Sequence, residues 1–112
     1  MDLSVRIGSL TLATPVMSAS GCFGYGLEYA DVVDLASLGG VVVKGLFLDE
    51  RQGHPAPRIV ETPAGMINAI GLQGIGVRRF VAEKLPGLRA IGATVIVNVC
   101  GTTLDEYAEV SR

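Results

Sequence analysis

The chain has 112 residues, a formal net charge of −2 and a mean hydropathy of +0.47. Its nine Lys and Arg residues are scattered, which argues against a nucleic-acid-binding surface. No apolar run approaches the roughly 18 residues of a membrane-spanning helix, and the start lacks the basic head of a signal peptide. We therefore expect a cytoplasmic chain with no nucleic-acid or membrane partner, whose high apolar content is covered by further protein.

Two distant cysteines without a C-x-x-C spacing and a single histidine weigh against a disulfide scaffold and exclude a His-based metal cluster within the chain. We expect no metal site. Both Cys22 and Cys100 are interpreted as small buried apolar residues, since no histidine lies nearby to activate either thiol. The aromatic pair Phe23 and Tyr25 is assigned to core packing rather than to a ligand.

The first part of the chain predicts a hairpin followed by a strand–helix–strand unit. Residues 3–12 read as two short strands joined at a Gly-Ser turn. Residues 15–19 predict a short buried strand, and a glycine-rich loop follows. Apolar spacing predicts a helix over residues 27–38. The continuous valines at 41–43 predict a strand buried on both faces.

A long excursion over residues 45–76 comes next, and its length without strong periodicity is typical of a functional segment. A helix is predicted over residues 77–85, with Phe80 and Val81 facing inward and an end at Pro86. Residues 94–99 predict another buried strand, and a Thr-x-x-Glu capping box starts a last helix near residue 104. Six apolar side chains of the excursion are expected to be buried and thereby to keep it ordered: Ile59, Val60, Met66, Ile67, Ile70 and Leu72.

Alternation of strands and helices, with β-branched strands, predicts parallel βα units and hence an α/β fold. Three units leave an open sheet with two bare edges. We therefore expect the first βα units of a (β/α)8 TIM barrel, which needs about 250 residues, preceded by the N-terminal β-hairpin. A small doubly wound sheet is the alternative, although no G-x-G-x-x-G follows a strand.

In a βα barrel the active site lies where strands end and loops begin. The residues at the three strand ends are Ser20, Lys44 with Gly45, and Asn98, and we expect them to surround one pocket together with Asn68. The lysine either reaches solvent or presents a fixed cation to an anion or a ring that becomes anionic. The asparagine after the last strand either bonds its own loop or a ligand, and the serine either caps a helix or donates to a ligand.

The segment 66–76 reads M-I-N-A-I-G-L-Q-G-I-G, and Asn68 and Gln73 are its only strongly hydrogen-bonding side chains. Its glycines let the backbone approach something flat, so it is a plausible wall for a small planar polar ligand. A glycine-rich turn with a capping Asn is the alternative.

An ordered set of motifs then carries a resemblance that covers the whole chain. It comprises A-S-G-C-F-G-Y-G-x-E, V-K-G, R-x-G-H-P-x-P-R-x-x-E-T-x-x-G-M-I-N-A-I-G-L-Q-G-x-G-V and N-V-C-G-T-T-x-x-E-Y. The set closely resembles class 1 dihydroorotate dehydrogenase, most of all the class 1B catalytic subunit. The resemblance implies an FMN-containing (β/α)8 barrel that oxidises dihydroorotate to orotate in pyrimidine biosynthesis.

By this resemblance, Ser20, Lys44, Gly45 and Asn98 contact FMN. The resemblance also implies that orotate is bound by Lys44, Asn68, Ala69, Ile70, Gly71 and Leu72. Residues 1–112 would form the N-terminal part of a single FMN-binding barrel domain. The family's catalytic base is a Cys that matches a position beyond Arg112, so we expect no catalytic residue here and no activity from these 112 residues alone.

The class 1B resemblance further implies a homodimer and a separate electron-transfer subunit that carries FAD and a 2Fe–2S cluster, with NAD as the final acceptor. Two alternatives remain open at the level of the sequence. One is a related FMN barrel that acts on another dihydropyrimidine. The other is a non-catalytic fragment that lacks the base and the phosphate site.

Overall fold

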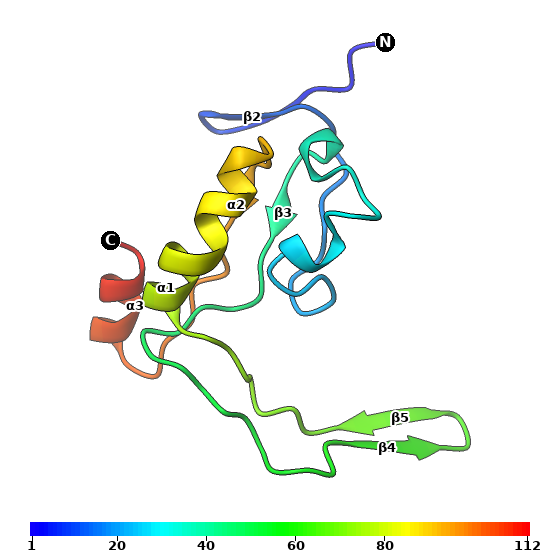
Figure 1. Cartoon of the computed structure of the whole chain (residues 1–112), viewed down its shortest axis with the longest axis vertical. Helices are drawn as coiled ribbons and strands as arrows, with labels where there is room; N and C mark the ends of the chain where they lie inside the picture. Colours follow the sequence, from blue (N-terminus) through cyan, green and yellow to red (C-terminus); the bar gives the residue numbers. More distant parts are fainter.

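The computed structural model describes all 112 residues. Its centre is a set of parallel segments in chain order, covered on one face by a long helix (Figure 1). Strand β3 (Val41–Val42) pairs in parallel with β6 (Val95–Ile96). On the other side of β3, a parallel bridge joins Met17 to Gly40. The predicted parallel order is therefore confirmed, although the segment predicted as the first strand forms only this one bridge.

The core gathers between β3 and the helix. Val41, Val43 and Leu46 are at most 1% exposed, and they pack in one cluster with Phe80 and Leu88. Val41 and Val43 are inaccessible, whereas Val42, on the other face, is half-buried. The prediction of a buried strand is therefore confirmed for one face, and β3 itself covers only Val41–Val42. The last strand is only half-buried, so the expectation that it is equally covered is wrong for this chain.

One continuous helix covers the sheet from residue 77 to 90, made of α1 (Val77–Arg79), the π-helical turn η3 (Phe80–Lys84) and α2 (Leu85–Ala90). The predicted break at Pro86 is wrong. A π-helical turn widens the helix directly before the proline, whose ring and missing N–H disturb a regular α-helix. Phe80 faces inward as expected, whereas Val81 is 50% exposed.

The predicted helix over residues 27–38 is also wrong. Two short 3-10 turns stand there, η1 (Leu27–Tyr29) and η2 (Leu35–Ser37). The Asp34 carboxylate accepts the N–H of Ala36 across 3.1 Å, a local bond that competes with helix continuation. Val32 is exposed, so no continuous apolar face holds a longer helix.

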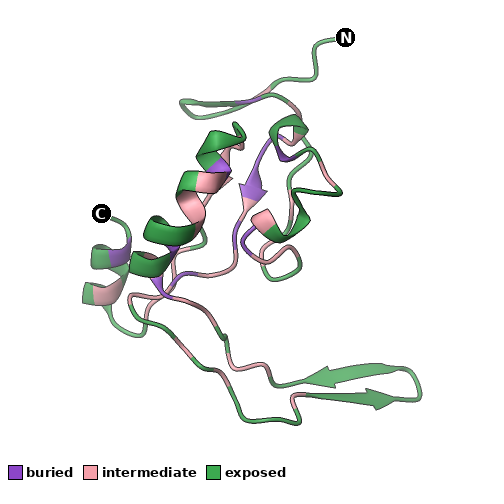
Figure 2. Ribbon diagram, in the orientation of Figure 1, coloured by how far each residue is buried: buried purple, intermediate pink, exposed green.

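The middle of the excursion forms a hairpin of β4 (Ile59–Thr62) and β5 (Gly65–Asn68), paired in antiparallel register. The hairpin extends away from the body, and all eight of its residues are exposed (Figure 2). The expectation that its apolar side chains are buried is therefore wrong for this chain.

Both ends of the chain form the elements that the sequence predicts. Strands β1 (Val5–Ile7) and β2 (Leu10–Leu12) make the N-terminal hairpin. Helix α3 (Leu104–Val110) starts at Thr103, whose hydroxyl oxygen accepts the N–H of Glu106. No helix combines the length and the apolar character that crossing a bilayer demands.

Candidate functional site

The parallel pairing brings the carboxyl ends of three segments to one edge. Leu46 donates its N–H to the carbonyl of Asn98 across 2.9 Å, which keeps the segments of β3 and β6 in register beyond the strands themselves. The Nδ2 group of Asn98 donates to the Ser20 hydroxyl oxygen across 3.2 Å. The structure thus confirms that the strand ends at Ser20, Gly45 and Asn98 meet.

Gly45 lies between these polar side chains and Cys100. A Cβ at Gly45 would lie 2.7 Å from the Cys100 sulfur and 3.6 Å from Asn98 Nδ2. The absence of a side chain therefore lets the two segments approach closely. Cys100 is half-buried, as an apolar role requires, but Cys22 is exposed, so its assignment to the interior is wrong.

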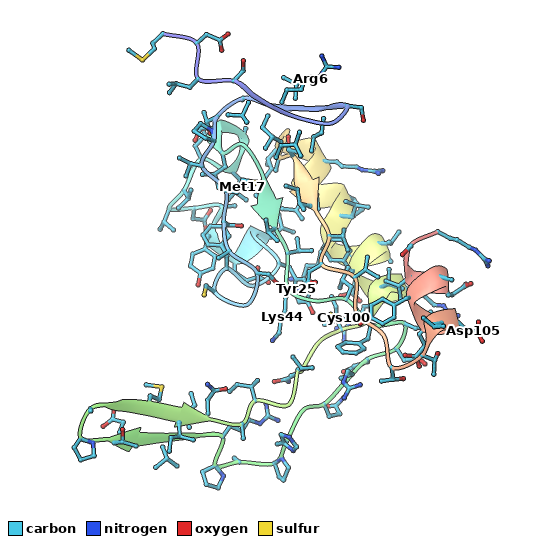
Figure 3. All side chains as sticks on the ribbon, turned by 180° about the vertical axis from the view of Figure 1, so that it is seen from behind. Arg6, Met17, Tyr25, Lys44, Cys100 and Asp105 are labelled. Carbon is cyan, nitrogen blue, oxygen red and sulfur yellow. The ribbon has the colours of Figure 1, made fainter.

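Lys44 presents a cation at the same edge. Its backbone N–H donates to the Gly24 carbonyl across 2.9 Å, which fixes the start of its side chain. The side chain is half-buried and forms no ion pair (Figure 3). It lines a cavity of about 180 Å³ together with Tyr25, Glu50, Arg51, Gln73, Gly74 and Ile75. An unpaired ammonium in a small polar cavity suits an anionic ligand.

The predicted substrate loop over residues 68–72 stands apart from this cavity. Asn68 is the last residue of β5, at the open end of the exposed hairpin, and no hydrogen bond joins it to the strand-end residues. Ala69 donates its N–H to the Arg58 carbonyl across 2.8 Å, and the Ile70 carbonyl accepts the N–H of His54 across 3.1 Å. The expectation that Asn68 shares one pocket with Lys44 is therefore not met in this conformation.

The end of the loop bends through two left-handed residues, Gly71 at φ 79° and Leu72 at φ 52°. A left-handed leucine is uncommon. These two residues line a cavity of about 440 Å³ whose other walls are Arg51, Gln52, Gly53 and His54. The loop therefore borders a polar hollow, even though it does not reach Lys44.

Arg58 lines neither cavity, but it bonds residues that line both, and the sequence did not predict this role. Its guanidinium donates to the His54 carbonyl, to Gln73 Oε1 at 2.6 Å and to the Gln52 carbonyl at 3.0 Å. These bonds hold the two arms of the excursion together. The signal in the sequence was an arginine in a glycine- and proline-rich segment, where a residue with several fixed donors can replace regular structure.

Tyr25 was assigned to the core, and the structure confirms that its ring is buried. Its hydroxyl oxygen also accepts the N–H of Ile75 across 3.1 Å, three residues beyond the substrate loop. Its own N–H donates to Glu28 Oε2 across 3.0 Å. Partial burial favours the neutral acid, but backbone hydrogen bonds and the Lys84 ammonium prevail and lower the pKa of Glu28.

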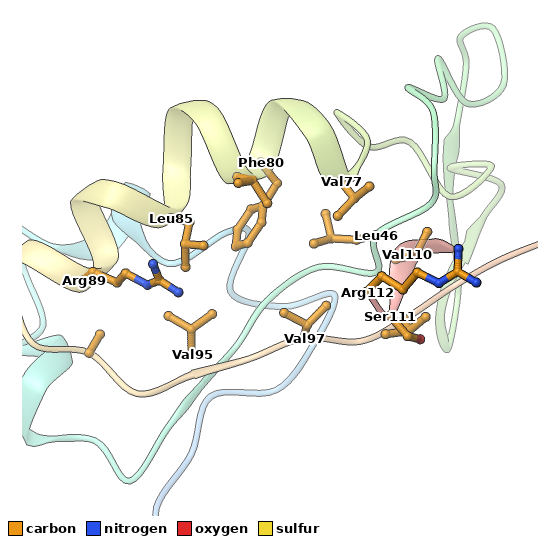
Figure 4. A pocket seen from close by; sticks show the side chains of 13 residues that line it. Leu46, Val77, Phe80, Leu85, Arg89, Val95, Val97, Val110, Ser111 and Arg112 are labelled. Atoms are coloured by element: carbon orange, nitrogen blue, oxygen red, sulfur yellow. The ribbon is translucent and has the colours of Figure 1, made fainter. Parts of the chain in front are cut away.

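A second, apolar groove of about 500 Å³ lies between the long helix and β6 (Figure 4). Ten of its thirteen lining residues are hydrophobic, among them Leu46, Phe80 and Val95. None of the strand-end residues lines it. The groove thus accepts apolar side chains and is distinct from the polar edge around Lys44.

The family model described as dihydroorotate dehydrogenase matches residues 2–112. The catalytic subunit of dihydroorotate dehydrogenase B (NAD(+)) from Thermodesulfovibrio yellowstonii is 58% identical over 110 residues, which are 98% of this chain and 36% of the relative. The subunit of the same name from Geotalea uraniireducens is 54% identical over 111 residues, 99% of this chain and 36% of that relative.

Among solved structures, DHODH from Eimeria tenella in complex with ferulenol matches with a TM-score of 0.62 and 23% identity, covering 96% of this chain and 32% of that chain. This likeness supports the fold. The chain spans 36% of the length of the curated relatives cited above. Since the family model matches nearly every residue, the chain belongs to the dihydroorotate dehydrogenase family.

Proposed function

We propose that these residues form the first βα units of a (β/α)8 barrel that oxidises dihydroorotate to orotate in pyrimidine biosynthesis. The observation that carries this proposal is the meeting of Ser20, Gly45 and Asn98 beside the unpaired Lys44 at one edge of a parallel sheet. The relatives that are 58% and 54% identical bear the name of the catalytic subunit of this dehydrogenase. We propose that residues 1–112 are the N-terminal part of a single FMN-binding barrel domain.

The strand-end residues fit an FMN cofactor. Asn98 and Ser20 offer an amide and a hydroxyl, and Gly45 adds backbone without a side chain. The cofactor, when bound, supplies a hydride acceptor. Lys44 would hold its positive charge next to the negative charge that develops on reduction, and a fixed cation in a partly buried site stabilises such charge.

Residues 68–72 are proposed to bind the dihydroorotate ring, together with Lys44. The Asn68 side chain is exposed and makes no hydrogen bond within the chain, so its two donors and its acceptor stay free for a flat ring. Contact with Lys44 requires the exposed hairpin to move toward the body. Loops that close over a substrate in this way are common in barrel enzymes.

Membership of the dihydroorotate dehydrogenase family also underlies our proposals for the partner subunit and the electron acceptor. The printed name "catalytic subunit" of the relatives supports a second subunit. We propose that this subunit carries FAD and a 2Fe–2S cluster and passes electrons to NAD, that the enzyme is a homodimer, and that it acts in the cytoplasm. The catalytic base is proposed to lie outside residues 1–112, so these residues alone are expected to leave dihydroorotate unchanged.

A chimera tests this proposal. This chain replaces the matched 110 residues of the Thermodesulfovibrio yellowstonii relative, and FMN content and orotate formation are measured beside the parent protein and the 112-residue chain alone. We expect the chimera to bind FMN and produce orotate, and the isolated chain to produce none. A folded, FMN-loaded chimera that oxidises dihydrouracil and not dihydroorotate would overturn the proposed substrate.

A further inference from the structure

Tyr25 joins the two halves of the proposed site through a single buried hydroxyl. Its ring is 7% exposed and packs on Phe80 with 5.8 Å between the ring centroids. A phenolic hydroxyl in such a place needs a partner, because burying an unbonded polar group is costly. The partner is the N–H of Ile75, at 3.1 Å.

This hydrogen bond links Tyr25 to the part of the chain that follows the proposed substrate loop. Ile75 follows the proposed substrate loop, and a Cβ at Gly74 would lie 3.1 Å from the Tyr25 hydroxyl. The same hydroxyl-bearing residue lines the small cavity into which Lys44 faces. One side chain therefore contacts the segment that follows the loop and also lines the cavity beside the cation.

The backbone around Tyr25 is fixed from the other side. The Gly24 carbonyl accepts the Lys44 N–H across 2.9 Å, and Glu28 accepts the Tyr25 N–H across 3.0 Å. The loop that carries Tyr25 is thus tied to the strand end that carries Lys44. A displacement of the Tyr25 hydroxyl would shift Ile75, and with it the segment that follows the substrate loop, relative to the lysine.

We propose that Tyr25 is a positioning residue whose hydroxyl fixes the segment that follows the substrate loop, at Ile75, relative to Lys44 and thereby sets the affinity for the dihydropyrimidine substrate. This inference rests on the proposed function, which assigns the loop to substrate and the lysine to the flavin. The hydroxyl bonds the backbone of Ile75, so its removal is expected to weaken binding of the substrate and to spare the chemical step.

The test is Tyr25→Phe in the chimera, which keeps the ring and deletes only the hydroxyl. Loss of one hydrogen bond is expected to raise KM for dihydroorotate about three- to tenfold and to leave kcat within about twofold. Hydrogen exchange at the Ile75 amide is expected to accelerate. Tyr29→Phe is the matched control, because the hydroxyl of this half-exposed tyrosine makes no hydrogen bond.

A second variant attacks the same contact from the other partner. Gly74→Ala crowds the Tyr25 hydroxyl and is expected to raise KM in the same direction, which keeps the test decisive if Tyr25→Phe fails to fold. An unchanged KM in a folded variant, even with a lower Tm, overturns the positioning role and leaves a structural one. An unsubstituted chimera that binds FMN yet forms no orotate instead overturns the proposed function.

Discussion

The amide of Asn98 donates to the hydroxyl of Ser20 across 3.2 Å, joining residues that are 78 positions apart in the chain. The two side chains meet because their segments flank β3 on opposite sides and end at the same edge. Gly45, at the end of the middle segment, has no side chain that would press on Cys100 and on the Asn98 amide. This arrangement is the basis for assigning the edge to FMN.

Ser20→Ala tests that assignment. We expect the chimera carrying this change to bind FMN about three- to tenfold more weakly, because it loses one hydrogen-bonding hydroxyl and frees the Asn98 amide to turn away. Flavin fluorescence during titration of the apoprotein measures the affinity. Ser9→Ala, in the exposed turn of the N-terminal hairpin, is the control. Equal affinities for both variants would contradict the role of Ser20.

Gly45→Ala tests the close approach of the strand ends. A methyl group there would lie 2.7 Å from the Cys100 sulfur, so we expect the free energy of unfolding to fall by about 1–3 kcal/mol. Urea denaturation of the chain measures the loss. Gly65→Ala is the matched control, since nothing lies within 4 Å of its added carbon. Adding Cys100→Ala should recover part of the loss, and a strictly additive double variant would contradict the contact.

The guanidinium of Arg58 is expected to hold the two arms of the excursion together. Arg58→Lys keeps the charge but cannot reach the carbonyls of Gln52 and His54 and the Gln73 side chain at once. We expect hydrogen exchange at the His54 amide to accelerate about fivefold, the equivalent of about 1 kcal/mol. Arg78→Lys, on an exposed helix face, should change nothing. Unaltered exchange in the Arg58 variant would show that the guanidinium does not hold the loops.

Helix α3 should depend on pH through Glu106. Hydrogen bonds from the Thr102 N–H and hydroxyl lower the pKa of this carboxylate from its ordinary value of 4.5. Because the folded-state pKa is depressed, the stabilisation is present above about pH 4.5 and is lost as pH falls through the lowered value. We expect Glu106→Gln to remove this component from acid unfolding followed by circular dichroism.

The control for that measurement is Asp105→Asn, which removes a carboxylate from the same turn. Asp105 accepts no hydrogen bond within the chain. Its replacement leaves the two hydrogen bonds from Thr102 to Glu106 in place, so it reports the loss of a charge from this turn without the loss of the cap. Identical curves for Glu106→Gln and the unsubstituted chain would contradict the capping role of Glu106.

The sequence predicted the features that depend on local patterns and on strand order. The valines at 41–43, the turn of the N-terminal hairpin and the capping box at Thr103 each specify their element through near neighbours. The meeting of Ser20, Gly45 and Asn98 followed from parallel connectivity alone. The role of these residues toward a flavin stays a prediction.

The predictions that were wrong concern segments whose conformation is decided by distant contacts or by competing local hydrogen bonds. The helix continues through Pro86 because a π-helical turn precedes it, and the 27–38 segment breaks because Asp34 bonds locally. Apolar character in the excursion suggested burial, but the hairpin has no protein layer over it in this chain. The bonds of Arg58 and the Tyr25 hydroxyl join residues whose proximity no local pattern encodes.

Lys44→Ala in the chimera tests the central claim most directly. The rate at which dihydroorotate reduces the bound flavin, measured by stopped-flow absorbance, should fall at least about a hundredfold, because removing a preorganised charge from a reacting site has effects of this size. Lys84→Ala, which removes a lysine paired with Glu28, is the control. An unchanged reduction rate in an FMN-loaded Lys44→Ala variant would contradict the account.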